Sequence, residues 1–421
     1  MNGSEQVLEE WNAYAKKKVL LGRDVDWKQL KKKAHLKIMA ITGIRRAGKS
    51  SVLIILLQKL LSQNEKAAYV NLEDSRIKKN PHLFDEIIKW FGDEGYLLLD
   101  EITSGEDWEG WLARNHELLK GKLKLIVSSS RRGLITPSKP LRGRILPLEL
   151  YPLSFLEFLQ FKEINLEKTT AGIGKIEKAL EEYLVYGGFP EVVISSGKID
   201  KIELLTSYFR DIIGLDIAEV SGEKVSTVEA FGKYVISASY FSASKALNSF
   251  KSLGYKIAKQ SLLDLERLSQ ESYLFFFVPI FSYSVKDRSQ YPRKAYLGDT
   301  GFMYALEGKT DYGRLFENLV YLKLRRSHLP TIEINYWKNR DGKEVDFVLR
   351  EGFKAKEIIQ VVYDLKEEKT IDREVSGLIA CAKEFSLNQG LIITRDVEKK
   401  EKKEGVHITF IPLWKWLFTT K

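Results

Sequence analysis

The stretch "ITGIRRAGKSSVLIILLQKLL" at residues 41–61 sets a glycine-rich, basic loop between two apolar runs. Gly43, Gly48, Lys49 and Ser50 fill the pattern G-x-x-x-x-G-K-[S/T]. The residues before the loop are typical of a buried strand, and those after it of a buried helix. Backbone N–H groups of such a loop, together with the N-terminus of the following helix, bind phosphate oxygens. The segment therefore predicts an α/β domain that binds a nucleoside triphosphate.

The lysine and the serine of this loop have separate predicted tasks. Lys49 is expected to reach the β- and γ-phosphates and to act in catalysis, and the Ser50 hydroxyl is expected to bind Mg²⁺. The residues predicted to bind ATP are those of the loop and the first helical turn: Gly43, Arg45, Arg46, Ala47, Gly48, Lys49, Ser50 and Ser51.

A second strand should deliver carboxylates to the metal. The run "GYLLLDEI" at residues 95–102 is apolar and ends in Asp100 and Glu101. Asp100 is expected to hold Mg²⁺ through water, and Glu101 to polarise the attacking water as a general base. The two acids could instead cap the following helix, but the apolar lead-in favours the catalytic interpretation.

Two more apolar runs, "KAAYVNLED" and "LKLIVSSS", are predicted strands of the same parallel sheet. The second ends in three serines at residues 128–130, one of which could sense the γ-phosphate or orient the water. Serines that end a strand also often only form turns, and the residues do not decide among the three. We take Ser129 as the candidate for this catalytic role.

Two arginines follow in "LRGRILPLELYPLSFLEFL", just outside the expected sheet edge. Arg142 or Arg144 could neutralise charge in the transition state, either in cis or from a neighbouring subunit. A surface ion pair with an acid is the alternative.

These residues resemble a known group of proteins. The pieces "GIRRAGKSS", "LLLDEI", "SSSRRGLI", "LRGRILPLELYPLSFLEFL" and "YLVYGGFPEVV" are similar to the archaeal P-loop ATPases of the AAA+ superfamily. That group is close to the STAND-type signalling ATPases, and many members end in a nuclease-like domain of unknown function. The resemblance implies ATP hydrolysis by Asp100 and Glu101, a sensor serine, and Arg144 as the arginine trigger.

The chain of 421 residues is too long for one hydrophobic core. The predicted organisation has four parts, all contributing to an α/β fold class. These are a P-loop AAA+ core with a parallel sheet (1–160), a helical lid broken at "YGGFP" (161–222), a winged helix (223–305) and a PD-(D/E)xK-like α/β domain (306–421).

In the predicted winged helix, residues 252–270 would form the recognition helix in a major groove. Three polar side chains near its start are the candidates for binding double-stranded DNA: Lys256, Lys259 and Gln260. A net charge of +10 favours polyanionic partners. Asp264 and Glu266 on the same stretch oppose phosphate binding, so a protein-docking wing is the alternative.

The C-terminal part matches the nuclease pattern incompletely. Glu317 and Asp346 occupy the first two acidic positions, but Gln360 and Val362 stand where an acid and a lysine are needed. The expectation is a degenerate site that does not cut DNA by the usual route. Residues that could replace the missing ones from elsewhere are Lys343, Lys354 and Glu344.

The remaining expectations come from composition. A lone cysteine, Cys381, allows no intramolecular disulfide, and no apolar run is long enough to span a bilayer, so a cytoplasmic protein without membrane insertion is expected. The charged run at residues 398–405 is expected to be a solvated loop. The leading functional hypothesis is an ATP-hydrolysing switch acting on DNA or a DNA-associated partner. The alternatives are a nucleotide-gated protein scaffold and an ATP-regulated nuclease, and the oligomeric state is left open.

Overall fold

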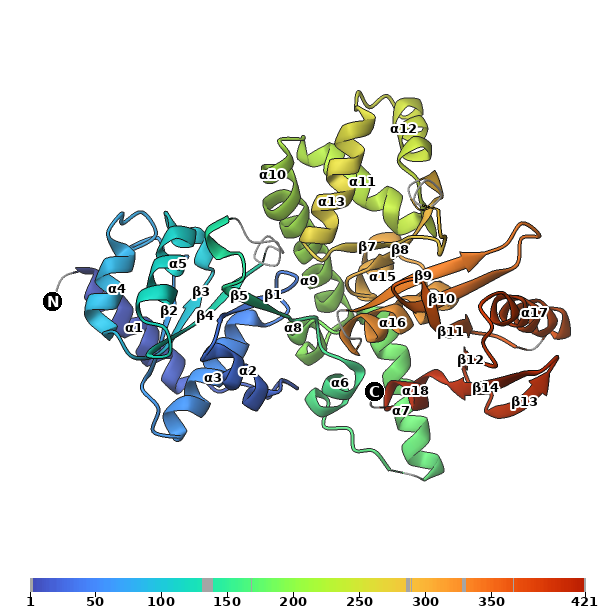
Figure 1. Ribbon diagram of the computed structural model, residues 1–421, viewed down its shortest axis with the longest axis horizontal. Helices are drawn as coiled ribbons and strands as arrows, with labels where there is room; N and C mark the ends of the chain where they lie inside the picture. Colours follow the sequence, from blue (N-terminus) through green and yellow to red (C-terminus); the bar gives the residue numbers. More distant parts are fainter. Residues whose placement is uncertain are drawn as a thin grey trace. The chain divides into compact units, whose positions relative to one another are not determined.

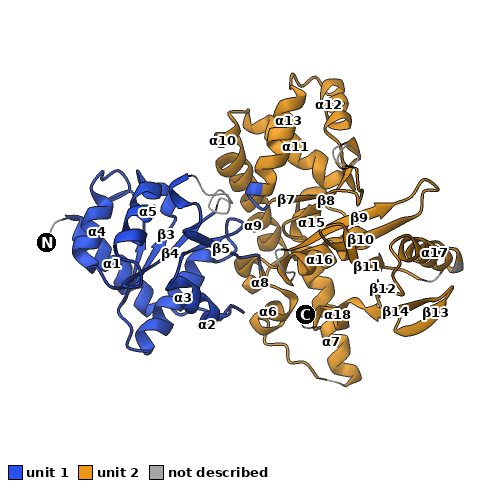
Figure 2. Ribbon diagram, viewed as in Figure 1, with its two compact units in different colours: residues 1–152, 271–273 blue, residues 153–270, 274–421 orange. Residues whose placement is uncertain are grey.

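The chain folds into two compact units, the first made of Met1–Pro152 and Glu271–Tyr273, the second of Leu153–Gln270 and Leu274–Lys421 (Figures 1 and 2). None of the described helices has the length and apolar character needed to cross a membrane. The computed structural model describes residues 3–130, 139–167, 169–284, 288, 290–327, 331–365 and 367–419.

The first unit contains a parallel five-stranded sheet in the order β2-β3-β4-β1-β5. Because all its strands point the same way, the residues that follow β1, β3 and β4 lie at one edge. The strands predicted from the sequence are confirmed, as is the P-loop type of α/β fold. The strands are β1 (Ile38–Thr42), β2 (Ala67–Asn71), β3 (Gly95–Asp100), β4 (Leu123–Ser129) and β5 (Ile145–Glu149).

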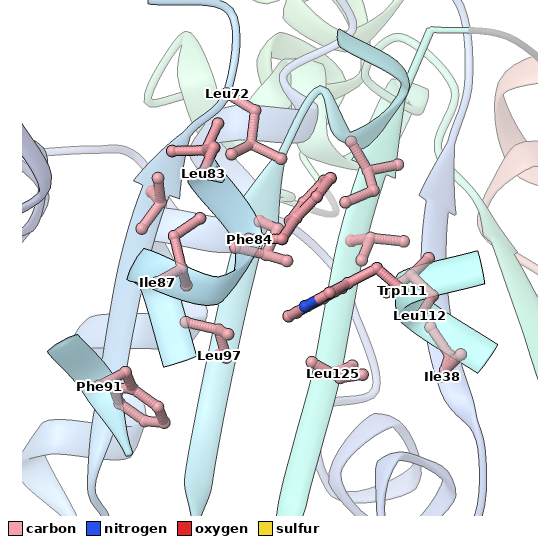
Figure 3. Packing of buried hydrophobic residues seen from close by; sticks show 14 of the residues in the cluster. Ile38, Leu72, Leu83, Phe84, Ile87, Phe91, Leu97, Trp111, Leu112 and Leu125 are labelled. Atoms are coloured by element: carbon pink, nitrogen blue, oxygen red, sulfur yellow. The ribbon is translucent and has the colours of Figure 1, made fainter. Parts of the chain in front are cut away.

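Helices cover both faces of this sheet. Ile38 and Ala40 of β1 pack in one apolar cluster, and Met39 and Ile41 in another, as the alternation of a strand requires. Figure 3 shows the first cluster, in which Phe84 of α4 stacks on Trp111 of α5 at 4.7 Å between ring centroids. The helices of this unit are α1 (Gly3–Lys17), α2 (Trp27–Ala34), α3 (Lys49–Ser62), α4 (Leu83–Phe91) and α5 (Trp108–Leu118), with short turns of 3-10 helix at Ile102–Ser104 and Lys139–Leu141.

The second unit begins with a group of helices. The predicted break at "YGGFP" is confirmed, because α7 ends at Tyr186, Gly187 has a φ of 73° and α8 begins at Pro190. A Cβ on Gly187 would lie 1.6 Å from Asp299 Oδ1. The helices are α6 (Phe155–Phe161), α7 (Thr170–Tyr186), α8 (Pro190–Ile194), α9 (Lys198–Asp211), a π-helix (Ile212–Ala218) and α10 (Glu219–Ser221).

A group of helices and a small antiparallel sheet come next, with the strands in the order β6-β8-β7. The helix predicted over residues 252–270 begins only at Lys259, because α12 ends at Ser252 and Gly254 turns the chain with a φ of 82°. The elements are α11 (Val225–Ser237), β6 (Tyr240–Phe241), α12 (Ala243–Ser252), α13 (Lys259–Glu271), β7 (Phe275–Val278), β8 (Arg293–Leu297) and α15 (Gly301–Glu307).

The C-terminal part has a six-stranded mixed sheet in the order β13-β14-β12-β11-β10-β9. The solvated loop predicted at residues 398–405 is wrong, since Lys399–Lys403 forms β13 and pairs antiparallel with β14. Its lysines suit an edge strand, where charge discourages pairing with other chains. The elements are α16 (Tyr312–Ser327), β9 (Ile332–Lys338), β10 (Glu344–Glu351), β11 (Lys354–Val362), α17 (Glu368–Glu384), β12 (Gln389–Thr394), β13, β14 (Val406–Pro412) and α18 (Leu413–Leu417).

Gly43, directly after β1, offers a direct test of the sheet geometry. A Cβ at this position would lie 1.9 Å from the Leu150 carbonyl oxygen, and its φ of 151° strains any other residue. We expect Gly43→Ala to lower the free energy of unfolding by about 2 kcal/mol or more, as overpacking does. Gly22→Ala, which meets nothing within 4 Å, is the matched control. The midpoints of urea unfolding measure the difference between the two variants. Equal midpoints would contradict the close approach of Gly43 to Leu150.

Candidate functional site

The predicted phosphate-binding loop joins the end of β1 to the first residue of α3. Gly48 has a φ of 96° and Arg46 one of 69°, so the backbone curls tightly before the helix begins. Ser50 is exposed on the first turn of α3, and Arg46 is exposed beside it. Arg45 and Ser51 are half-buried, and Ala47 is buried.

Lys49 is buried inside this loop rather than extended into solvent. Its Nζ donates hydrogen bonds to the carbonyl oxygens of Gly43 at 3.0 Å and Ile44 at 3.2 Å. A charged acceptor such as a phosphate oxygen forms a stronger hydrogen bond with an ammonium group than a neutral carbonyl does. If a phosphate enters the loop, the Lys49 ammonium can therefore exchange a carbonyl acceptor for a phosphate oxygen with a gain in hydrogen-bond strength.

Asp100, the last residue of β3, is held by two hydroxyl groups. Tyr69 of β2 donates to Oδ2 at 2.7 Å, and Ser128 of β4 donates to Oδ1. The carboxylate is buried, and burial raises the pKa of Tyr69 far above its ordinary value, so the phenol remains a donor. Two neighbouring strands thus fix the orientation of the predicted metal-binding carboxylate.

Glu101 follows with a left-handed backbone, with a φ of 49°, which a residue with a side chain adopts only at a cost of about 1–3 kcal/mol. Its N–H donates to Ser128 Oγ at 3.0 Å, and its Oε2 accepts from the Ser130 N–H at 3.4 Å. Burial raises the pKa of this carboxyl, and Asp100 adds to the rise, whereas Lys49 opposes it. The arrangement suits a proton acceptor, which must be ionised and therefore loses activity as the pH falls through that raised pKa.

All three serines that end β4 are buried, but their contacts differ. Ser128 bonds to both acidic residues, and Ser130 reaches Glu101 through its backbone. Ser129 lies beside Thr42 in the register of β4 against β1. Ser128 therefore makes the contacts expected of a residue that links the two acidic residues, and the sensor role of Ser129 stays a prediction.

Arg144 lies at the opposite end of the sheet, where the parallel strands begin. Its carbonyl accepts from the Ile38 N–H at the start of β1, and its side chain forms an ion pair with Glu117 at 3.3 Å. The loop follows the other end of β1, roughly 15 Å away for a strand of this length. β5 runs parallel to β1 and begins directly after Arg144, so this arginine lies at the end of the sheet away from the loop. The prediction that Arg144 acts in cis is therefore wrong. Arg142 is exposed in the same turn.

Two residues near the loop carry no recognisable sequence pattern. Arg23, which is buried, donates to the Ala47 carbonyl at 2.6 Å and to the Tyr151 carbonyl at 2.9 Å. Tyr273 is hydrogen-bonded to Thr42 at 2.9 Å, although 231 residues separate them. Each ties a distant segment of the first unit to an end of β1 or to its loop.

The residues predicted in the second unit are found in two places. Lys259 and Gln260 are exposed at the start of α13, and Lys256 is exposed in the segment just before it. Glu317 of α16 and Asp346 of β10 come together around a lysine of β8, whereas Val362 is buried in the apolar core of the C-terminal sheet. Gln360 accepts from the Asp346 N–H at 3.1 Å and donates to Glu374 at 2.6 Å.

Comparison with known proteins gives a full-length relative. An uncharacterized protein of Methanocaldococcus jannaschii, MJ1544, is 31% identical over 433 residues, which cover 99% of this chain and 95% of the relative. The chain belongs to the family of MJ1544. An uncharacterized Haemophilus influenzae protein is 25% identical over 90% of the chain and 94% of its own length.

Family models match successive parts of this member. They are an AAA domain at residues 35–159, a domain of unknown function (DUF8612) at 177–312 and a second one (DUF4143) at 312–416. The first unit is thus an AAA-type P-loop domain. Among solved structures, AMPPCP-bound DnaA from Aquifex aeolicus is 16% identical, with a TM-score of 0.28, over 61% of this chain and 91% of that one.

Tyr69 tests the assembly around Asp100. Tyr69→Phe removes one of its two hydroxyl donors, and loss of a group that orients a metal ligand typically costs about 10- to 100-fold in metal affinity or activity. We expect the Mg²⁺ concentration needed for half-maximal ATP turnover to rise by about tenfold. Tyr96→Phe, which removes a buried hydroxyl bonded to His35 in the same sheet, is the matched control and should leave it unchanged. Equal effects in both variants would contradict the role of Tyr69.

Proposed function

We propose that this chain is an ATP-hydrolysing molecular switch of the AAA+ type. The observation that supports it best is the meeting of a P-loop lysine, a hydroxyl-held aspartate and a strained glutamate at one edge of one parallel sheet. ATP and Mg²⁺ are the ligands that such a set of residues suits. ADP would remain as the product.

In this proposal each residue has a distinct task. Lys49 binds the β- and γ-phosphates, and the Ser50 hydroxyl and Asp100 hold Mg²⁺, which neutralises phosphate charge when bound. Glu101 accepts the proton of the attacking water. Ser128 fixes the two acidic residues relative to each other through its hydrogen bonds to Asp100 and to the Glu101 N–H.

An arginine trigger, if Arg144 supplies it, acts on a neighbouring subunit. Its ion pair with Glu117 is half-exposed, and such pairs contribute at most about 1 kcal/mol, so the side chain can be recruited by a phosphate at low cost. Turnover per subunit would then rise with protein concentration.

The first test separates binding from turnover. Lys49→Ala removes the buried ammonium of the loop, so we expect ATP affinity and turnover both to collapse while the fold is retained. Glu101→Gln keeps the shape but loses the base, so ATP should still bind while turnover falls by about a hundredfold. Isothermal titration with ATP and a phosphate-release assay measure the two quantities.

The same pair distinguishes the enzyme from a nucleotide-gated protein scaffold. A scaffold needs ATP occupancy only, so Glu101→Gln would leave its ATP-dependent interactions intact. Native turnover in that variant contradicts the assignment of the base, and unchanged ATP binding in Lys49→Ala contradicts the P-loop assignment.

We propose further that α11, α12, α13 and the sheet β6-β8-β7 form a winged helix that binds double-stranded DNA. Lys259 and Gln260, exposed at the start of α13, and Lys256, exposed just before it, support this proposal. Of the two acidic residues on this stretch, Glu266 is buried and paired with Arg293, and the half-exposed Asp264 lies 3.9 Å from Arg267. The start of α13 therefore presents positive charge.

DNA binding by this surface has a distinct salt signature. Lys256→Ala with Lys259→Ala removes two phosphate contacts, so the slope of log affinity against log salt should fall by about two. Lys175→Ala with Lys178→Ala, exposed lysines of α7, is the matched control. Fluorescence anisotropy with a short duplex measures the slopes. An unchanged slope in the first pair contradicts a DNA interface on α13.

A further inference from the structure

A lysine lies at the centre of the acidic cluster in the second unit. Lys294 of β8 is buried, and its Nζ lies 2.6 Å from Asp346 Oδ1, 3.0 Å from Glu317 Oε1 and 3.0 Å from Glu344 Oε1. The three carboxylates come from the helix α16 and the strand β10. Lysine has three N–H donors, which equals the number of carboxylates around it.

Other groups hold the same carboxylates in place. Asp346 Oδ2 accepts from the Val361 N–H at 2.9 Å, and Glu317 Oε1 accepts from the Tyr296 hydroxyl at 2.6 Å. Tyr240 donates to Glu344 Oε1, the oxygen that also faces the ammonium. The cluster is therefore organised around Nζ, and its geometry does not depend on a metal ion.

The residues present do not fit a divalent metal at this position. A magnesium ion needs carboxylate oxygens at about 2.0–2.1 Å, and a metal bound here would have to take the three oxygens that face Nζ. Three carboxylate oxygens within 3.0 Å of Nζ favour the charged ammonium over the neutral amine. The ammonium consequently keeps its charge. Among the described residues, no group of His, Cys, Asp and Glu forms a metal-binding set.

A second basic side chain lies beside the cluster. A cavity of about 170 Å³ adjoins the cluster, and its lining includes Arg314 in addition to Lys294. Lys343 and Lys354, the lysines nearest in sequence to the degenerate motif, are exposed on the C-terminal sheet and do not fill the position. The cation comes instead from β8, more than twenty residues before Glu317.

We propose that the Lys294 ammonium takes the place of the divalent metal in this nuclease-like site. The cluster is then an internal ion-pair centre that joins β8 to α16 and β10, and the domain does not cleave DNA by metal-dependent chemistry. The inference does not rest on ATP hydrolysis, because every residue involved belongs to the second unit.

The proposal predicts that a metal site appears when the lysine charge is removed. Lys294→Met keeps most of the side-chain volume and leaves three carboxylates facing one another, which destabilises the fold until a cation replaces the ammonium. Without metal we expect the thermal midpoint of this variant to fall by roughly 5 °C or more. Mn²⁺ should restore it, and one Mn²⁺ per chain should bind at roughly micromolar to submillimolar concentration.

Electron paramagnetic resonance of free Mn²⁺, with the full chain and without nucleotide, measures this binding. The native chain and Lys294→Arg should bind no Mn²⁺ at this cluster. Lys294→Met should bind one, and Lys294→Met with Asp346→Asn should bind at least tenfold more weakly. A folded Lys294→Met that binds no Mn²⁺ overturns the proposal.

The native chain provides a second readout, which does not depend on the folding of a Lys294 variant. Linear, circular and single-stranded DNA are incubated with the native chain in Mn²⁺ or Mg²⁺, beside Asp346→Asn. No cleavage and no stoichiometric Mn²⁺ binding support the proposal. Cleavage that disappears in Asp346→Asn, or Mn²⁺ binding that disappears in Glu317→Gln, overturns it and makes Lys294 a catalytic lysine of an active nuclease.

Discussion

The parallel pairing of β1, β3 and β4 is the constraint on which the first unit depends. Pairing brings Thr42 beside Ser129 and Leu99 beside Val127, so the strands end at one level and Asp100 comes within reach of Ser128. A slip of one residue would turn the apolar side chains of a strand to the opposite face. Packing of both faces therefore fixes the register, and the register fixes the site.

Buried polar groups at this edge are satisfied by one another. Asp100 accepts from Tyr69 and Ser128, and Ser128 accepts from the Glu101 N–H, so each hydroxyl both orients a carboxylate and avoids the cost of an unpaired buried group. Such a network defines one geometry for the carboxylates. It also explains why a left-handed Glu101 is tolerated, because its N–H and its side chain are both bonded.

Local patterns predicted the parts of the site that lie within single elements. The loop of Gly43 to Ser50 and the acidic pair at the end of β3 could be recognised because their chemistry requires fixed spacing along the chain. Tyr69, Arg23 and Lys294 were missed because each acts on residues distant in sequence, and no pattern accompanies them. The cis role of Arg144 was misjudged for a related reason, since the position of this arginine depends on which end of β5 lies next to it.

Two buried lysines show how the partners of a charge decide its use. Lys49 donates to the neutral carbonyls of Gly43 and Ile44, so a phosphate oxygen offers it a stronger acceptor than it gives up. Lys294 already faces three carboxylates, and its removal would leave those carboxylates buried without a countercharge. The first lysine is suited to capture an anionic ligand and release it. The second is suited to remain in place, which is the behaviour of a structural cation rather than of a group that changes partners.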